Sequence, residues 1–169
     1  MEELLIQNPF LVGKYVSDRY FCDRKEETSF FVKQIMNGRN VALISPRRLG
    51  KTGLIRHCFN QEELKSLYYT FFVDIYATTS FEEFVYLLGK SIYEELKPKK
   101  TQWAERFFQA ISSLRVGFKL DAMTGEPSFD IGLGNIQSPQ TTLDEIFAYL
   151  ESADRPCIVA IDEFQQITE

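Results

Sequence analysis

Histidine, cysteine and long apolar runs are scarce in this chain of 169 residues. It has 1 histidine and 3 cysteines, and Cys22, Cys58 and Cys157 lie far apart without a C-x-x-C pair. This spacing argues against a zinc site or a disulfide framework and favours buried free thiols, so we expect a cytoplasmic protein. No apolar run approaches the roughly 20 residues of a membrane span, and the acidic start is unlike a secretory signal. No membrane partner is therefore expected.

An excess of positive charge is also missing. The chain has 19 Lys and Arg against 24 Asp and Glu, a formal net charge of −5. Because proteins that bind nucleic acid usually carry a basic face, this segment is not expected to bind nucleic acid. Apolar residues make up 44% and charged residues 25%, as in ordinary globular proteins, and the length fits a single domain over residues 1–169.

A basic loop separates an apolar run from an amphipathic segment. Residues 41–45 predict a strand, and residues 52–60 predict a helix directly after Lys51. Strand, loop ending in Gly-Lys-Thr and helix together form the context of a phosphate-binding loop, in which backbone N–H groups and the helix dipole hold an anion. The alternative interpretation is a surface turn that contains these residue types by chance.

The residue types in this loop suggest individual roles. We expect Lys51 to contact the β- and γ-phosphates of a nucleotide and Thr52 to be a Mg²⁺ ligand. The usual pattern begins with glycine, where this chain has Ser45. Arg47 and Arg48 either touch phosphate or are solvated. The candidate nucleotide-binding residues are Ser45, Pro46, Arg47, Arg48, Leu49, Gly50, Lys51, Thr52 and Gly53.

A second apolar run ends in two acids. Residues 157–161 predict a buried strand that presents Asp162 and Glu163 at its carboxyl end, where ligands bind in open α/β sheets. We expect Asp162 to hold Mg²⁺ through water and Glu163 to polarise the attacking water, with Lys51 as the other catalytic residue. The two motifs together predict ATP and Mg²⁺ as cofactors.

Other segments have clear periodic patterns. Helices are expected from about Asp23 to Gly38, over residues 81–96 behind a Ser80–Glu83 capping box, around residues 103–114, and after Thr142 with Glu145. A strand is expected over residues 67–76, an inserted β-hairpin over 115–134 and an extended lead-in over 1–20.

Three polar residues near these elements are interpreted as structural. Asp74 at the end of the 67–76 strand is expected to cap, not to react. His57 is expected to be structural, and Gln165 to leave the sheet instead of sensing nucleotide.

The order of these pieces resembles the archaeal and bacterial P-loop ATPases related to the AAA+ and STAND groups. The resemblance covers nearly the whole chain and rests on Asn8-Pro9-Phe10, residues 21–27, the loop 46–52 and residues 161–165. It implies an α/β fold of three layers, with helices on both faces of a mainly parallel sheet in the strand order 5-1-4-3-2. It also implies ATP binding and Mg²⁺-dependent hydrolysis. The family has a Gly-Arg pair where this chain has Asp23-Arg24, so adenine-side contacts are not carried over.

This strand order places a fourth strand between the two motif strands, and no residues for it precede Glu169. The resemblance therefore implies the N-terminal portion of an ATPase domain, whose missing C-terminal region is one expected partner. We expect this chain to bind nucleotide weakly, to hydrolyse little and to self-associate through open strand edges. The other known order, of kinase- and GTPase-like proteins, places the motif strands side by side.

Three functions remain open at this point. The first is an ATPase that drives movement or remodelling. The second is a nucleotide-dependent regulatory switch with slow turnover, and the third is a small-molecule kinase.

Overall fold

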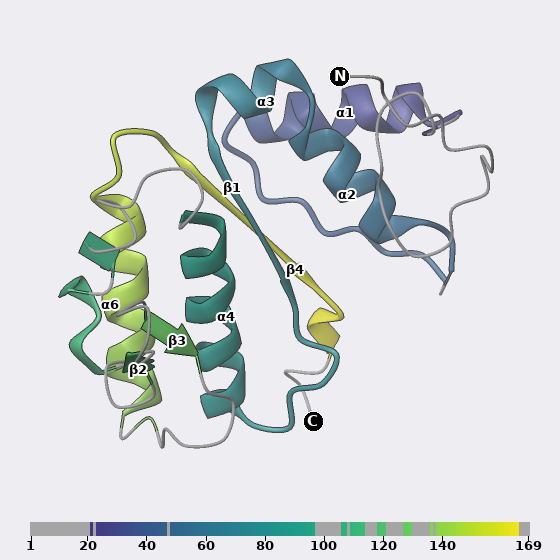
Figure 1. Ribbon diagram of the computed structural model, residues 1–169. Helices are drawn as coiled ribbons and strands as arrows, with labels where there is room; N and C mark the ends of the chain where they lie inside the picture. Colours follow the sequence, from purple (N-terminus) through teal and green to yellow (C-terminus); the bar gives the residue numbers. More distant parts are fainter. Residues whose placement is uncertain are drawn as a thin grey trace, which may run out of the picture. The chain divides into compact units, whose positions relative to one another are not determined.

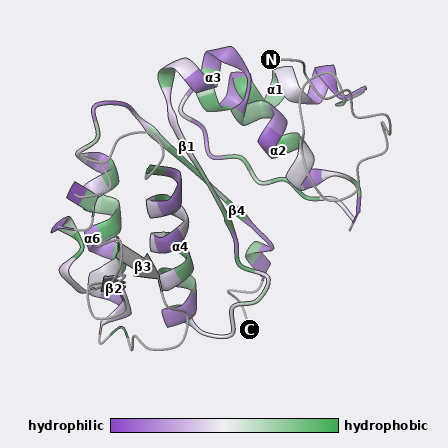
Figure 2. Ribbon diagram, viewed as in Figure 1, coloured by the Kyte–Doolittle hydropathy of each residue, from purple (hydrophilic) through white to green (hydrophobic). Residues whose placement is uncertain are grey.

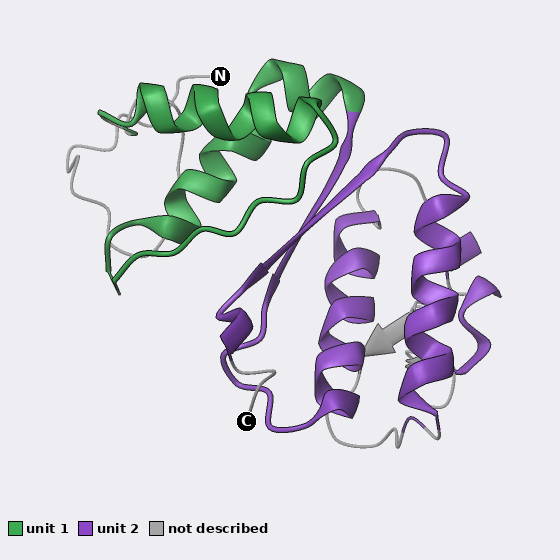
Figure 3. Ribbon diagram, turned by 180° about the vertical axis from the view of Figure 1, so that it is seen from behind, with its two compact units in different colours: residues 1–67 green, residues 68–169 purple. Residues whose placement is uncertain are grey.

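The structure is a computed structural model that describes Phe21 and residues 23–46, 48–96, 106–107, 109–113, 118–120, 127–129, 136 and 138–165. The chain divides into two compact units, residues 1–67 and 68–169, coloured separately in Figure 3. The expected lead-in over residues 1–20 lies outside the described residues, and the single domain over residues 1–169 stays a prediction.

The described part of the first unit contains three helices, α1 (Lys25–Met36), α2 (Lys51–Phe59) and α3 (Glu62–Leu67). Phe31 and Ile35 lie one turn apart on α1 and are both buried. Gly38 ends this helix as predicted: its φ is +68°, and its N–H donates to the Ile35 carbonyl at 2.8 Å. The predicted capping box at Asp23 is wrong, because Arg24 is the N-cap residue and no side chain caps the helix.

The apolar run before the basic loop does not form the predicted strand. Residues 41–46 have no regular secondary structure, and the side chain of Ile44 is 94% exposed. A strand needs a neighbour to pair its backbone N–H and C=O groups. The described part of the first unit contains no strand to serve as that neighbour.

The second unit is built on two parallel strands, β1 (Tyr69–Asp74) and β4 (Cys157–Asp162), which confirm two predicted strands. They pair in register from Tyr69 with Cys157 to Asp74 with Asp162. Figure 2 shows β4 coloured mainly as hydrophobic. Parallel strands need a long crossover connection, and the chain between them contains helices. The fold is therefore α/β.

Two helices, α4 (Phe81–Leu96) and α6 (Pro139–Glu151), lie side by side next to the strand pair (Figure 1). Because side chains alternate along a strand, Phe71 and Val73 face these helices together. The buried core comprises Phe71, Val73, Ile75, Phe84, Val85, Leu88, Ile92, Tyr93, Leu96, Phe107, Ile111, Ile136, Ile146, Tyr149 and Leu150.

The start of α4 confirms the predicted capping box. The Glu83 N–H donates to the Ser80 hydroxyl at 3.2 Å, and the Glu83 carboxylate accepts the Thr79 N–H at 2.6 Å. These bonds satisfy backbone donors in the first turn that have no partner within the helix. The local sequence was sufficient to place this helix start.

The start of α6 differs from the prediction. The helix begins at Pro139 with Ser138 as N-cap, so Thr142 lies within it and is buried. The Glu145 carboxylate accepts hydrogen bonds from Ser112, at 2.9 Å, and from Ser113 instead of capping its own helix. Proline is favoured in the first turn of a helix, where its missing N–H costs nothing.

The predicted hairpin is present as two short antiparallel strands, β2 (Phe118–Leu120) and β3 (Pro127–Phe129). Its turn lies outside the described residues. Of the helix predicted around residues 103–114, residues 106, 107, 109 and 110 are helical. The Phe107 ring packs edge-on against Tyr149 with centroids 5.0 Å apart.

Candidate functional site

The basic loop ends in a backbone conformation suited to an anion. Arg48 has φ +66°, and Gly50, the N-cap of α2, has φ +71° and ψ 26°. Where left-handed residues follow right-handed ones, successive backbone N–H groups can converge on one anion. The amino end of α2, with its partial positive charge, follows immediately. The loop therefore places backbone donors and a helix terminus next to each other.

Lys51 closes this loop. Its ammonium Nζ donates to the carbonyl of Ser45 at 2.9 Å and to the carbonyl of Pro46 at 3.2 Å. The first and last parts of the predicted loop are thus held together by the residue predicted to contact phosphate. Thr52, in the first turn of α2, is exposed, as is Arg48, whereas Arg47 lies outside the described residues.

Arg24 is a loop contact that sequence reasoning missed. Its Nη1 donates to the carbonyls of Leu49, at 3.1 Å, and Gly50, at 3.3 Å. Its Nε and Nη2 donate to the two carboxylate oxygens of Glu27, the second at 3.0 Å. The hydrogen bonds with Glu27 raise the pKa of Arg24, and those with Arg24 lower the pKa of Glu27. The signal in the sequence is an Arg and a Glu three residues apart at a helix start.

A ring contact also joins the segment before α1 to α2. Phe21 stacks on His57 with ring centroids 3.8 Å apart and an interplanar angle of 12°. The Gln61 amide nitrogen lies 3.2 Å from His57 Nε2. These contacts support the structural role that was predicted for His57.

The carboxyl ends of the two parallel strands bring two aspartates together. Asp74 and Asp162 are register partners, so they lie on the same face of the sheet. Asp162 accepts the Glu163 N–H at 3.0 Å, and Asp74 accepts the Tyr76 N–H at 2.9 Å. The second bond holds the turn that follows β1, and no helix begins there for Asp74 to cap.

Glu163 follows the strand in an unusual conformation. Its φ is +59°, in the left-handed region that residues with a Cβ seldom adopt. Its carboxylate accepts a hydrogen bond from the Gln165 side chain. Left-handed backbone in a non-glycine residue is often found at functional sites.

The acids at the strand ends offer a small number of carboxylate oxygens. Among the described residues, no group of three or more His, Cys, Asp or Glu side chains is placed to hold a metal ion. Mg²⁺ commonly takes only one or two protein carboxylates and completes its shell with water and phosphate oxygens. Asp162 with its neighbour Asp74 fits that mode of binding, and it does not fit a metal site made of protein ligands alone.

The predicted site residues therefore fall into two groups. Ser45, Pro46, Gly50 and Lys51 come together in the first unit. Asp162 and Glu163 come together in the second unit. Gly53 is an interior residue of α2, and a Cβ there would meet nothing within 4 Å.

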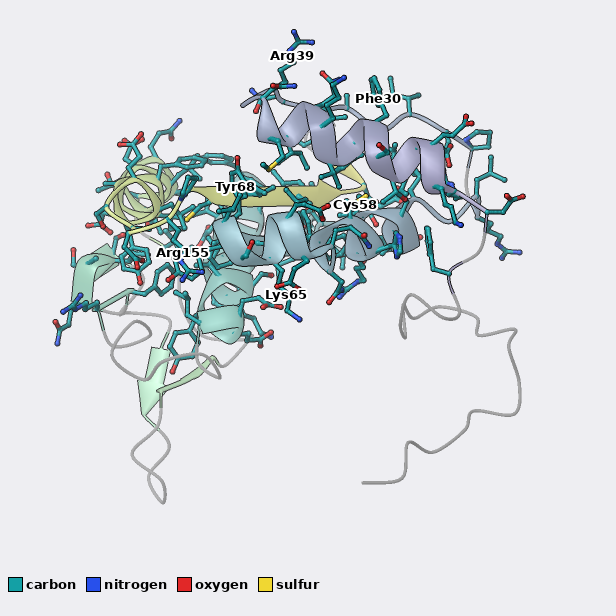
Figure 4. The ribbon with its side chains drawn as sticks, turned by 90° about the horizontal axis from the view of Figure 1, so that it is seen from above. Phe30, Arg39, Cys58, Lys65, Tyr68 and Arg155 are labelled. Atoms are coloured by element: carbon teal, nitrogen blue, oxygen red, sulfur yellow. The ribbon has the colours of Figure 1, made fainter. Side chains whose placement is uncertain are left out.

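Cysteine chemistry finds no support in the described residues. Cys58 and Cys157 are free thiols. Cys58 belongs to α2 and is fully buried, with its side chain toward α1 (Figure 4). Burial raises the pKa of each thiol to about 11, so both are protonated and unreactive near neutral pH. Cys22 lies outside the described residues.

Gly50→Ala should lower the free energy of unfolding by about 1–2 kcal/mol, because alanine is strained at positive φ. A steric clash is not the reason, since the added Cβ would lie 3.7 Å from Arg24 Nη1, an ordinary contact. Gly53→Ala is the matched control and should be neutral or stabilising by up to about 1 kcal/mol, since this glycine lies inside a helix. Urea unfolding followed by circular dichroism measures both, and equal effects would contradict the left-handed assignment.

No described helix has both the length and the apolar character required to cross a membrane.

Comparisons with known proteins add no relative: no family model, curated protein or solved structure gives a significant match to this chain.

Proposed function

We propose that this chain binds ATP through the loop at residues 45–53 and supplies acids for its Mg²⁺-dependent hydrolysis. The observation that carries the proposal is the loop itself. Left-handed Arg48 and Gly50 precede the amino end of α2, and the Lys51 ammonium lies across the loop on the Ser45 and Pro46 carbonyls. Backbone N–H groups, a helix terminus and a lysine are the donors that a polyphosphate requires.

Lys51 has a distinct task in this proposal. Its Nζ now bonds two neutral carbonyls, and phosphate oxygens are stronger acceptors because they carry charge. Lys51 would exchange one set of contacts for the other when a nucleotide binds. This exchange favours the polyphosphate part of the ligand over the nucleoside.

Metal binding and water activation for ATP hydrolysis are assigned to Asp162 and Glu163. Asp162, with Asp74 beside it, would hold Mg²⁺, which neutralises charge on the phosphate oxygens when bound. Glu163 would accept a proton from the attacking water as the general base. Both groups are assigned to one nucleotide on the basis of their sequence motifs.

The strand pairing is compatible with the proposed type of ATPase. In the order 5-1-4-3-2 the second and third strands are neighbours and parallel, and β1 and β4 form such a pair. We therefore retain the resemblance to AAA+ and STAND ATPases and a three-layer sheet as part of the proposal. A slow nucleotide-dependent switch is the second candidate, because the same residues would bind ATP in either case.

Equilibrium dialysis of the purified chain against radiolabelled ATP tests the proposal. We expect saturable binding in the presence of Mg²⁺, competition by ADP and by inorganic triphosphate, and little competition by adenosine. A chain that retains no ATP at millimolar concentration would overturn the proposal.

Release of inorganic phosphate from ATP separates the remaining functions. Many turnovers per protein indicate an ATPase, since enzymes typically have a turnover number of about 10 s⁻¹. Saturable binding with fewer than about one turnover per hour, far below that value, indicates a switch. Phosphate transferred to an added small alcohol instead of water would indicate a kinase.

A further inference from the structure

We infer that Arg24 is a positioning residue for the phosphate-binding loop: anchored by Glu27, it holds the Leu49 and Gly50 carbonyls and so aims the loop N–H groups at a phosphate. The inference deepens the proposed function and rests on it. It assigns a role in this site to the segment before α1, which is 25 residues away from Leu49 in the sequence.

The Arg24 guanidinium bonds the loop and Glu27 at the same time. Nη1 donates to both loop carbonyls, at 3.1 and 3.3 Å, while Nε and Nη2 bind the two oxygens of Glu27. Only arginine has a planar fork of donors that can do both. The Arg24 side chain is 25% exposed and that of Glu27 55% exposed, so this is a partly solvated ion pair at the loop.

The direction of each loop carbonyl fixes the direction of the N–H group in the same peptide. In a planar trans peptide the C=O and the following N–H point in opposite directions. Arg24 binds the oxygens of the Leu49–Gly50 and Gly50–Lys51 peptides, and the second oxygen also accepts the Leu54 N–H at 2.9 Å. The N–H groups of Gly50 and Lys51 are therefore turned away from Arg24. Fixing these two peptides in advance reduces the ordering that phosphate binding would otherwise require.

The charge of Arg24 does not explain the arrangement as a direct phosphate contact. Its guanidinium is already paired with the Glu27 carboxylate, so the pair adds little net positive charge. The Arg24 backbone is also held, because its carbonyl accepts the Thr28 N–H at 2.9 Å and the Thr28 hydroxyl at 2.7 Å. Arg24 thus connects the first turn of α1 to the loop, and its contribution is to orientation.

Arg24→Ala tests the inference, with Arg39→Ala as the matched control. Arg39 also belongs to the first unit, and its Nη1 bonds the Gln34 side chain at 3.1 Å. Its side chain extends outward in Figure 4. Affinities of the parent and both variants for ATP, ADP, AMP and adenosine are measured by calorimetry in Mg²⁺ buffer.

We expect Arg24→Ala to lower ATP affinity about tenfold, the factor that corresponds to roughly 1.4 kcal/mol. The loss should shrink from ATP to AMP and vanish for adenosine, because the aimed N–H groups act on phosphates. Arg24→Lys should recover only part of the loss, and Arg39→Ala should match the parent. Unchanged ATP affinity in Arg24→Ala, or an equal loss for adenosine, would overturn the inference.

Trypsin cleavage at Arg48 and Lys51 provides a reading that does not depend on nucleotide. Without the Arg24 contacts the loop should open more often, so cleavage there should be several-fold faster in Arg24→Ala than in Arg39→Ala. Equal cleavage rates would overturn the inference. A parent chain that binds ATP while Arg24→Ala is unaffected refutes the inference alone, whereas a parent that binds no ATP refutes the proposed function as well.

Discussion

Lys51→Ala is expected to lower the affinity for MgATP by about 10- to 100-fold, the range that one lost charged hydrogen-bond partner of roughly 1.5–3 kcal/mol produces. The variant removes the only ammonium that bonds the Ser45 and Pro46 carbonyls among the described contacts. Calorimetric titration with ATP in Mg²⁺ buffer measures the effect. The loss should be larger for ATP than for adenosine, because lysine contacts phosphate and not the nucleoside.

Two controls separate binding from folding in this experiment. Lys65→Ala removes an exposed lysine of α3 from the same unit and should leave affinity unchanged. The unfolding midpoint of Lys51→Ala reports the cost of losing its two carbonyl contacts. If Lys51→Ala binds ATP as tightly as Lys65→Ala does, the loop is not a nucleotide site.

Glu163→Gln should reduce the rate of ATP hydrolysis by about 10²- to 10⁴-fold, the usual contribution of a general base. The amide keeps the shape of the side chain but cannot take a proton from water. ATP affinity should stay within about threefold, a change of only roughly 0.7 kcal/mol. The measurement is phosphate release under saturating ATP, made on the protein as its source produces it, including any residues that follow Glu169.

Glu151→Gln is the matched control for this substitution, since it makes the same change at the exposed end of α6. It should hydrolyse ATP at the parent rate. A Glu163→Gln protein that also keeps the parent rate would remove Glu163 from the catalytic role. Loss of both binding and hydrolysis would instead indicate that Glu163 supports the loop after β4.

The sequence by itself determined the elements whose signals are local. The apolar steps of three and four residues specify α4, and Ser80 with Glu83 specifies its start. Runs of aromatic and β-branched residues specify β1 and β4, since such side chains fit a pleated, half-buried surface. Each of these signals depends on residues within a few positions of one another, so no knowledge of the fold was needed to interpret it.

The strand predicted over residues 41–45 is not formed, and it shows where local sequence signals fail. Its apolar composition is that of a strand, yet the described first unit offers no strand beside it. Secondary structure in a sheet is stabilised by pairing with another segment, and composition does not reveal whether that segment is present. The predicted start of α6 was wrong for a related reason. Glu145 accepts hydrogen bonds from Ser112 and Ser113, about thirty residues earlier, and does not cap its own helix.

The candidate site was likewise predicted in part from the sequence and completed by the tertiary structure. Residue types and spacing were enough to single out Gly50, Lys51, Asp162 and Glu163, because phosphate and metal chemistry restricts which side chains can serve. Only the tertiary structure placed Asp74 beside Asp162, through the register of two strands far apart in the chain. It alone placed Arg24 on the loop carbonyls. These contacts join distant segments, and their geometry follows from packing that no short stretch of sequence encodes.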